Sequence, residues 1–102
     1  MTQRDTSTIS RTQIDVREPA MFRVIYINDE HTSMEFVVGS LVDHFAYTEE
    51  AAAKIALDIH NAGAAVVAVL PYEIAEQKGI EITMSARANG YPLQIKLEPD
   101  SV

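Results

Sequence analysis

The spacing of apolar residues predicts three strands. Residues 22–27 are β-branched and aromatic and end at Asn28-Asp29, which is typical of a strand. Their apolar side chains fall on both faces, as expected of a strand inside a sheet. Residues 64–70 form a continuous apolar run of strand length, which predicts a second, well-buried strand. Residues 93–97 alternate apolar and polar side chains, which predicts a half-buried third strand.

Apolar residues at helical spacing predict two consecutive helices between the first two strands. Thr32 and Glu35 have the spacing of a capping box, and an apolar stripe runs behind them over residues 34–45. Thr48 then provides a hydroxyl cap followed by two acids, and Gly63 provides a stop. The short connection between the two stripes makes these helices a hairpin.

A third helix is predicted between the second and third strands. Pro71 suits its first turn, and Asn89-Gly90 marks its end. Its apolar positions are Ile74, Ala75, Ile82 and Ala86. The elements therefore run strand, helix, helix, strand, helix, strand. The economical arrangement of this order is an α+β fold, a small three-stranded antiparallel sheet with three helices on one face.

The chain divides into an extension and one domain. Residues 1–20 are rich in Thr, Ser, Gln and Arg without an apolar period, which predicts a flexible N-terminal extension. They lack the apolar centre of a secretory signal, and their acids balance their bases, unlike a transit peptide. Residues 21–102 suffice for one domain with one core. Because no apolar run approaches about 20 residues, we expect no membrane span.

Charge and composition narrow the classes of partner. The 102 residues carry a formal net charge of -7, all of it on residues 21–102, which hold five bases and twelve acids. Such a surface repels phosphate backbones, so we expect no nucleic-acid partner, whereas a cationic ligand group is attracted. The absence of Cys excludes disulfides, thiol catalysis and thiolate metal sites, and fits a reducing cytosol.

Two polar features are candidates for function, and each also has a purely structural interpretation. Asn28, Asp29, Glu30 and His31 lie between a strand and a helix, where side chains are exposed for recognition, but Asn and Asp also simply turn a chain. His60 lies near the end of the second helix, where a histidine is commonly a helix-dipole partner or a packing residue. The residues alone leave both alternatives open.

Enzyme chemistry finds little support in the sequence. His31, His44 and His60 form no H-x-x-H or HExxH pair, so we expect no metal site. A serine acting with His60 and Asp29 is possible by residue type, but no G-x-S-x-G turn is present. The scattered glycines form no phosphate-binding loop. A binding module without a cofactor is therefore favoured over an enzyme.

Residues 22–38 resemble the signature of the ClpS family, an apolar strand followed by N-D-D-x-T-P-M-E-F-V. Three further matching pieces follow in order: Ile59-His60 with Gly63, residues 73–78, and residues 86–89 with Pro92-Leu93. The resemblance covers roughly residues 21–98. Several linked motifs in register are far more specific than any single one.

The resemblance implies an adaptor, not an enzyme. Members of the family recognise N-degrons, proteins that begin with Phe, Tyr, Trp or Leu. They deliver them to the N-terminal domain of the AAA+ unfoldase ClpA, which feeds the ClpP protease, and they also modulate substrate choice. The resemblance further implies a bacterial cytoplasmic protein, and we expect a monomer.

The resemblance also assigns roles to residues. It places the substrate's α-amino group among Asn28, Asp29 and His60. A hydrophobic pocket for the first side chain would be lined by Thr32, Met34, Val37, Val38, Ala56, Ile59 and Leu93. Contacts with the unfoldase would come from Glu73 and Lys78. Met34 would also exclude β-branched first residues, and the extension through residue 20 would engage the unfoldase during handover.

Three positions depart from the family pattern. Glu30 replaces the second Asp, which leaves its contact with the substrate's second residue open. Ser33 replaces Pro at the helix start, with the cap expected on Thr32. Ala56 stands where a bulkier Met is usual, which should enlarge the pocket and favour aromatic residues over Leu. These departures leave open an alternative, a ClpS-like regulator of the unfoldase with altered or lost N-degron recognition.

Overall fold

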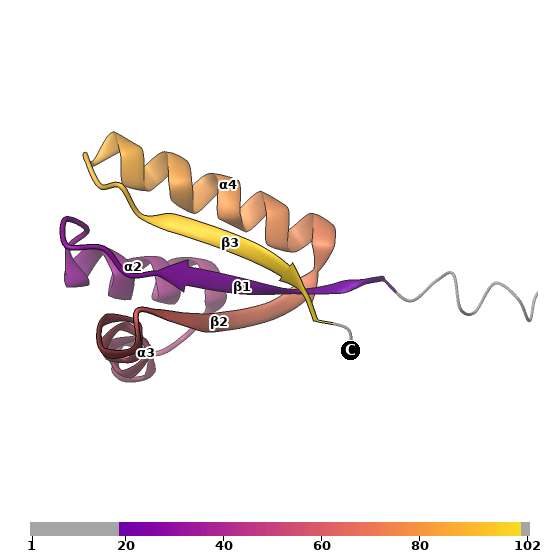
Figure 1. Cartoon of the computed structure of the whole chain (residues 1–102), viewed down its shortest axis with the longest axis horizontal. Helices are drawn as coiled ribbons and strands as arrows, with labels where there is room; N and C mark the ends of the chain where they lie inside the picture. The colour runs from indigo at the N-terminus through magenta and orange to yellow at the C-terminus, as the bar shows by residue number, and fades with distance from the viewer. Residues whose placement is uncertain (1–18, 101–102) are drawn as a thin grey trace, which may run out of the picture.

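The computed structural model describes residues 19–100. Nearly all of the predicted extension, residues 1–18, lies outside the described residues, as do residues 101–102. The elements in chain order are β1 (Met21–Ile27), α2 (Met34–Phe45), α3 (Glu49–Ala62), β2 (Ala64–Pro71), α4 (Tyr72–Ala88) and β3 (Gln94–Pro99) (Figure 1). This order confirms the predicted one.

The three strands form one antiparallel sheet in the order β2-β1-β3. The central place of β1 agrees with its apolar residues on both faces. The prediction that residues 64–70 are well buried was wrong, because β2 is an edge strand with one uncovered face. Val66 and Val69 are 47% and 40% exposed, whereas Val67, beside an irregularity in the register with β1, is only 2% exposed.

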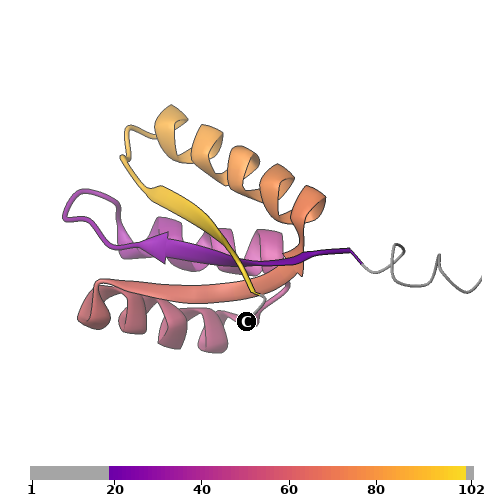
Figure 2. The same cartoon turned by 45° about the vertical axis from the view of Figure 1, so that its right-hand side comes forward.

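The helices cover the face of the sheet that carries Val24 and Tyr26, both fully buried. Figure 2 shows the sheet in front with α2 behind β1, α4 above it and α3 below it. The opposite face carries charged side chains, where Glu98 accepts from Arg23 at 3.2 Å and lies 3.0 Å from the Lys96 ammonium. Because helices cover only one face of the sheet, this is an α+β sandwich, as predicted.

Several predicted helix boundaries are confirmed and two details are wrong. Thr48 caps α3 by accepting a hydrogen bond from the Ala51 amide at 3.1 Å, and Gly63 ends α3 in the left-handed conformation. Pro71, in contrast, is the last residue of β2, and α4 begins one residue later. Ile74, predicted to face the core, is 46% exposed.

A buried hydrogen bond ties the sheet to α2. The Tyr26 hydroxyl lies 2.8 Å from the Ser40 hydroxyl, which donates its only proton to the Val37 carbonyl at 2.7 Å. Tyr26 is therefore the donor to Ser40. Burial raises the pKa of Tyr26 to about 12, with the Ser40 hydrogen bond partly opposing it, so the hydroxyl keeps its proton at neutral pH.

We predict that this hydrogen bond couples the stabilities of β1 and α2. Tyr26→Phe should lower the free energy of unfolding by about 1–2 kcal/mol, because it leaves a buried hydroxyl without its donor. Ser40→Ala should cost a similar amount, and the double variant less than the sum of the two. Urea denaturation measures all three values. Additive losses would contradict the coupling.

Candidate functional site

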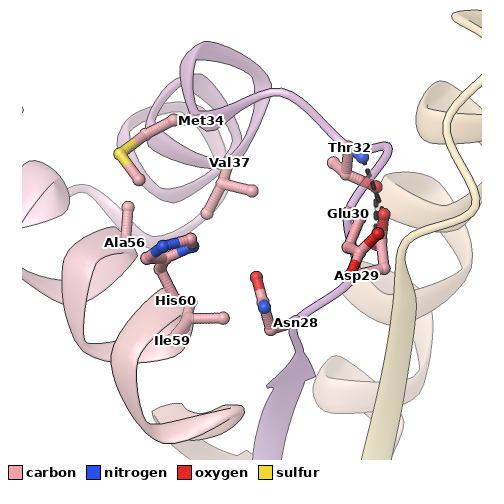
Figure 3. Close-up of a pocket in the computed structure, with 9 residues that line it drawn as sticks. All are labelled: Asn28, Asp29, Glu30, Thr32, Met34, Val37, Ala56, Ile59 and His60. Carbon is pink, nitrogen blue, oxygen red and sulfur yellow. Dashed lines mark hydrogen bonds between the residues drawn. The ribbon is translucent and has the colours of Figure 1, made fainter.

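A cavity of about 350 Å³ opens between the loop after β1, the start of α2 and the end of α3 (Figure 3). Its size lies within the range usual for small-ligand sites. The residues that line it are Asn28, Asp29, Glu30, Thr32, Met34, Val37, Ala56, Ile59 and His60. All nine had been singled out from the sequence. The structure therefore brings together two separate segments of the chain, residues 28–37 and residues 56–60.

The end of β1 is joined to the end of α3 through Gly63. The backbone N–H of Asn28 donates to the backbone carbonyl of Gly63 at 2.9 Å. The backbone N–H of Gly63 donates in turn to the carbonyl of Ile59, also at 2.9 Å. Gly63 has φ 92°, a left-handed value at which other residues are strained. This connection holds His60, in the last turn of α3, beside Asn28. From the sequence, Gly63 was expected to end the helix and to belong to a motif with Ile59 and His60, but its contact with Asn28 was not predicted.

The polar side of the cavity offers hydrogen-bond acceptors to a ligand. Figure 3 shows the amide of Asn28 and the imidazole of His60 projecting into the same space. Asn28 is partly buried and His60 is exposed. The Asn28 amide has an acceptor oxygen and a donor nitrogen, and a neutral imidazole has one acceptor nitrogen. Together they can receive a group that carries several N–H donors.

Asp29 organises the loop after β1. Its carboxylate accepts from the backbone amides of His31 and Thr32 and from the Thr32 hydroxyl, each at 2.7 Å. Burial alone would raise its pKa, but these hydrogen bonds from Thr32 and His31 outweigh it and hold the pKa of Asp29 below its usual value. The side chain is thus an ionised anchor, with most of its acceptor capacity used inside the loop.

The start of α2 corrects the predicted cap. The N-cap is Ser33, whose hydroxyl accepts from the Phe36 amide at 3.0 Å, whereas the Thr32 hydroxyl binds Asp29. With the cap at Ser33, Glu35 no longer occupies the third helical position that a capping box requires. Ser33, a departure from the family pattern, therefore supplies the helix start itself.

The apolar side of the cavity is formed by side chains of the core. Val37, Ala56 and Ile59 are 8%, 3% and 2% exposed, and their side chains line the cavity. Met34 is 45% exposed and lies at the edge of the same space, near Ala56 (Figure 3). A bulky apolar group that entered here would be removed from water on several sides.

Four predicted residues lie away from this cavity. Val38 lines a separate groove on α2, and Leu93 is 1% exposed and borders a hollow beside β3. Glu73 and Lys78 are on α4. Glu73 is exposed in the first turn, and the Lys78 ammonium lies 5.8 Å from the centroid of the Phe45 ring, a cation–π contact with α2.

Within residues 19–100, no cluster of three or more His, Asp or Glu side chains is arranged to hold a metal ion. Across the same range, no helix has the length and apolar character needed to cross a membrane. The cavity itself combines polar acceptors at one side with an apolar wall at the other. That combination suits a ligand with a donor-rich head and an apolar body.

The fold and the cavity define a small α+β domain with a ligand-sized site at a strand–helix junction. Residues 17–96 match the family model described as ATP-dependent Clp protease adaptor protein ClpS. The chain therefore belongs to the ClpS family, a family of protease adaptors and not of enzymes.

Individual relatives agree with this assignment. The chain is 46% identical over 83 residues to the ATP-dependent Clp protease adapter protein ClpS of Bdellovibrio bacteriovorus, which covers 81% of this chain and 73% of the relative. It is 40% identical over 93 residues to ClpS 1 of Rhodopseudomonas palustris, with 91% and 90% covered. Among solved structures it is similar to Agrobacterium tumefaciens ClpS2 bound to L-phenylalaninamide, with a TM-score of 0.78, 34% identity, and 81% and 100% covered.

We predict that mutation will identify Ser33 as the N-cap of α2. Ser33→Ala should lower the free energy of unfolding by about 1 kcal/mol, because the Phe36 amide loses its acceptor. Thermal or urea denaturation measures the loss, and the far-ultraviolet circular dichroism of the folded state should stay unchanged. The matched control is Ser85→Ala on the exposed side of α4, where no cap is removed and the loss should be under about 0.5 kcal/mol. Equal losses would contradict the assignment.

Proposed function

We propose that this chain is an adaptor that binds the free N-terminus of proteins beginning with Phe, Tyr, Trp or Leu. The observation that carries the proposal is the shared cavity of Asn28 and His60, which has polar acceptors beside an apolar wall. The α-amino group occupies the polar side and the first side chain the apolar side. A polypeptide that lacks either feature leaves one side of the site unmatched.

The chemistry of an α-amino group fits the polar side. An ammonium has three donors, and the Asn28 oxygen and a neutral His60 nitrogen provide two acceptors. A bridging water molecule accepts the hydrogen bond from the third ammonium proton. Asp29 contributes mainly its negative charge, because its low pKa keeps it ionised while its oxygens bind the loop. Glu30, at the rim, faces the substrate's second residue.

The apolar side accommodates the first side chain. Thr32, Met34, Val37, Ala56 and Ile59 line it, whereas Val38 and Leu93, which the sequence had placed in the pocket, lie away from the cavity. L-phenylalaninamide, which is bound by the Agrobacterium relative, carries a free amino group and an aromatic side chain. That relative's ligand supports the same two-part recognition here.

Delivery requires a second surface. We assign this role to α4, with Glu73 and Lys78 contacting the N-terminal domain of a ClpA-type unfoldase that works with ClpP. Both residues lie away from the cavity, so a substrate and the unfoldase can bind together. Residues 1–20 serve in this proposal as the extension engaged during handover. The protein acts as a cytoplasmic monomer without a cofactor.

We predict that a peptide with a free N-terminal Phe binds, whereas its N-acetylated form and a peptide with an internal Phe do not. Acetylation removes the ammonium, and an internal Phe also brings a preceding chain that collides with the rim. Fluorescence anisotropy or calorimetry measures the three affinities. Asn28→Ala or His60→Ala should weaken binding of the first peptide about 10- to 100-fold, as expected for a hydrogen bond to a charged group.

His44→Ala is the matched control, because His44 lies outside the cavity and contacts Glu81 at 3.7 Å. This variant should bind like the natural protein. Failure of all three peptides to bind would reject N-terminus recognition. If the chain then still bound the unfoldase's N-terminal domain, the alternative function as a regulator would replace the adaptor.

The small Ala56 side chain predicts a preference for aromatic residues. Ala56 lines the cavity, so a Leu side chain underfills the space that a Phe ring occupies. We expect a Phe-initiated peptide to bind about tenfold tighter than a Leu-initiated one, because Leu would bury less apolar surface, by an amount equivalent to roughly two methylene groups. Ala56→Met should reduce this ratio. Equal affinities for the two peptides in the natural protein would contradict the prediction.

A further inference from the structure

An exposed apolar surface lies between α4 and the edge strand β3, away from the candidate site. It is a groove of about 320 Å³, called the α4–β3 groove from here on, and is lined by Glu76, Gly79, Ile80, Thr83, Met84, Ile95 and Leu97. Ile80 and Met84, four positions apart on one face of the helix, are 54% and 67% exposed. Among the large apolar side chains of residues 19–100, these two are the most exposed.

The chain enters the described fold at one end of this groove. The Tyr72 amide, in the first residue of α4, donates to the Ala20 carbonyl at 3.1 Å. The Asp100 amide, just after β3, donates to the Met21 carbonyl at 2.9 Å. Figure 1 accordingly shows β1 beginning beside the start of α4 and the end of β3. Glu76, where the groove begins along α4, is four residues after Tyr72 and so about 6 Å further along the helix.

The 18 residues before Pro19 are more than long enough to reach along the groove. The groove follows α4 from Glu76 to Met84, eight residues on, a distance of about 12 Å. An extended segment covers that distance with about four residues. Residues 13–16 can therefore lie along the groove when about three residues are used to reach it from Pro19.

The composition of the extension suits this surface better than a second copy of the domain does. Ile14 and Val16 are its large apolar residues closest to Pro19, and an extended segment places residues two apart on the same face. Residues 1–20 carry three bases and three acids, whereas residues 21–102 carry the whole net charge of -7. Two copies of the domain therefore repel each other, but the extension is not repelled.

We propose that the α4–β3 groove is the docking site of this chain's own N-terminal extension, with Ile14 and Val16 packed against Ile80 and Met84. Because the extension is tethered beside the groove, its effective concentration there is on the order of millimolar, so a contact too weak to hold a free peptide is populated. Docking covers the two most exposed apolar side chains of α4 and leaves the cavity open. The inference needs neither a substrate nor the unfoldase and does not rest on the function proposed above.

Nuclear magnetic resonance of the methionine methyl groups tests the proposal in the full chain. The sequence has four Met and no Cys, so one introduced Cys carries a nitroxide spin label at a single position. With the label on Gln13→Cys, the Met84 methyl signal should lose most of its intensity relative to the chemically reduced label. Met34, at the edge of the cavity, should keep its intensity. Equal Met84 intensities with the active and the reduced label would overturn the inference.

The matched control adds Ile14→Ser and Val16→Ser to the same spin-labelled chain. It keeps the length and charge of the extension and removes its apolar side chains, so the Met84 signal should recover. Ile80→Ser, on the groove side, should restore the Met84 signal in the same way, and circular dichroism verifies that this variant is folded. Signal loss that persists in either variant would contradict docking, because it would reflect only the tether.

A mixed sample distinguishes the chain's own extension from that of another copy. Spin-labelled chains without isotope are mixed with isotope-labelled chains that carry no spin label, and Met84 should then keep its intensity. Loss of the Met84 signal in this mixture would assign the groove to a neighbouring copy and reject the intramolecular contact.

Discussion

The backbone hydrogen bond from Asn28 to Gly63 is the contact on which the site depends. It attaches the end of the central strand to the end of α3 at 2.9 Å. Without this hydrogen bond, nothing would hold Asn28, after β1, close to His60, in the last turn of α3. Because a glycine with φ 92° closes α3 at the same point, the chain can turn directly into β2 and leave its carbonyl free for Asn28. The polar side of the cavity therefore follows from how a helix ends.

The loop between β1 and α2 completes the site by being rigid. Asp29 receives three hydrogen bonds from within the loop, and Ser33 starts α2 immediately after it. A site whose loop is already ordered loses less conformational freedom when a ligand binds. Two of the residues that depart from the expected family pattern contribute differently here: Ser33 provides the capping hydroxyl of α2, and Ala56 places a small side chain in the cavity wall.

Several features encoded locally were predicted correctly, whereas the choice of cap and the burial of β2, which neighbouring elements set, were not. Thr48 and Gly63 act within a turn of their own positions, so their roles could be inferred from sequence. Thr32 and Ser33 are adjacent hydroxyl residues, and the choice of cap depended on where Asp29 takes its hydrogen bonds. The burial of β2 depended on its place at the sheet edge, which an apolar run does not specify.

The cavity shows the same limit. Consecutive residues on a helix point about 100° apart, so Val37 lines the cavity while Val38 faces the separate groove on α2. All residues around the polar side were nevertheless identified, because the linked motifs fix them as a group. The sequence did not predict that the Asp29 carboxylate accepts hydrogen bonds within its own loop, because those bonds depend on the folded path of the backbone.

The two edge strands of the sheet, β2 and β3, expose side chains of different kinds to solvent. Outward-facing side chains on β3 include Lys96 and Glu98, joined in an ion pair, whereas β2 presents Val66 and Val69 to water. An edge strand with unpaired backbone groups and apolar side chains is a template for strand addition by another chain. Self-association in crowded or concentrated samples therefore has a defined route through β2. A single lysine at Val66 would close it without touching the cavity or the α4–β3 groove.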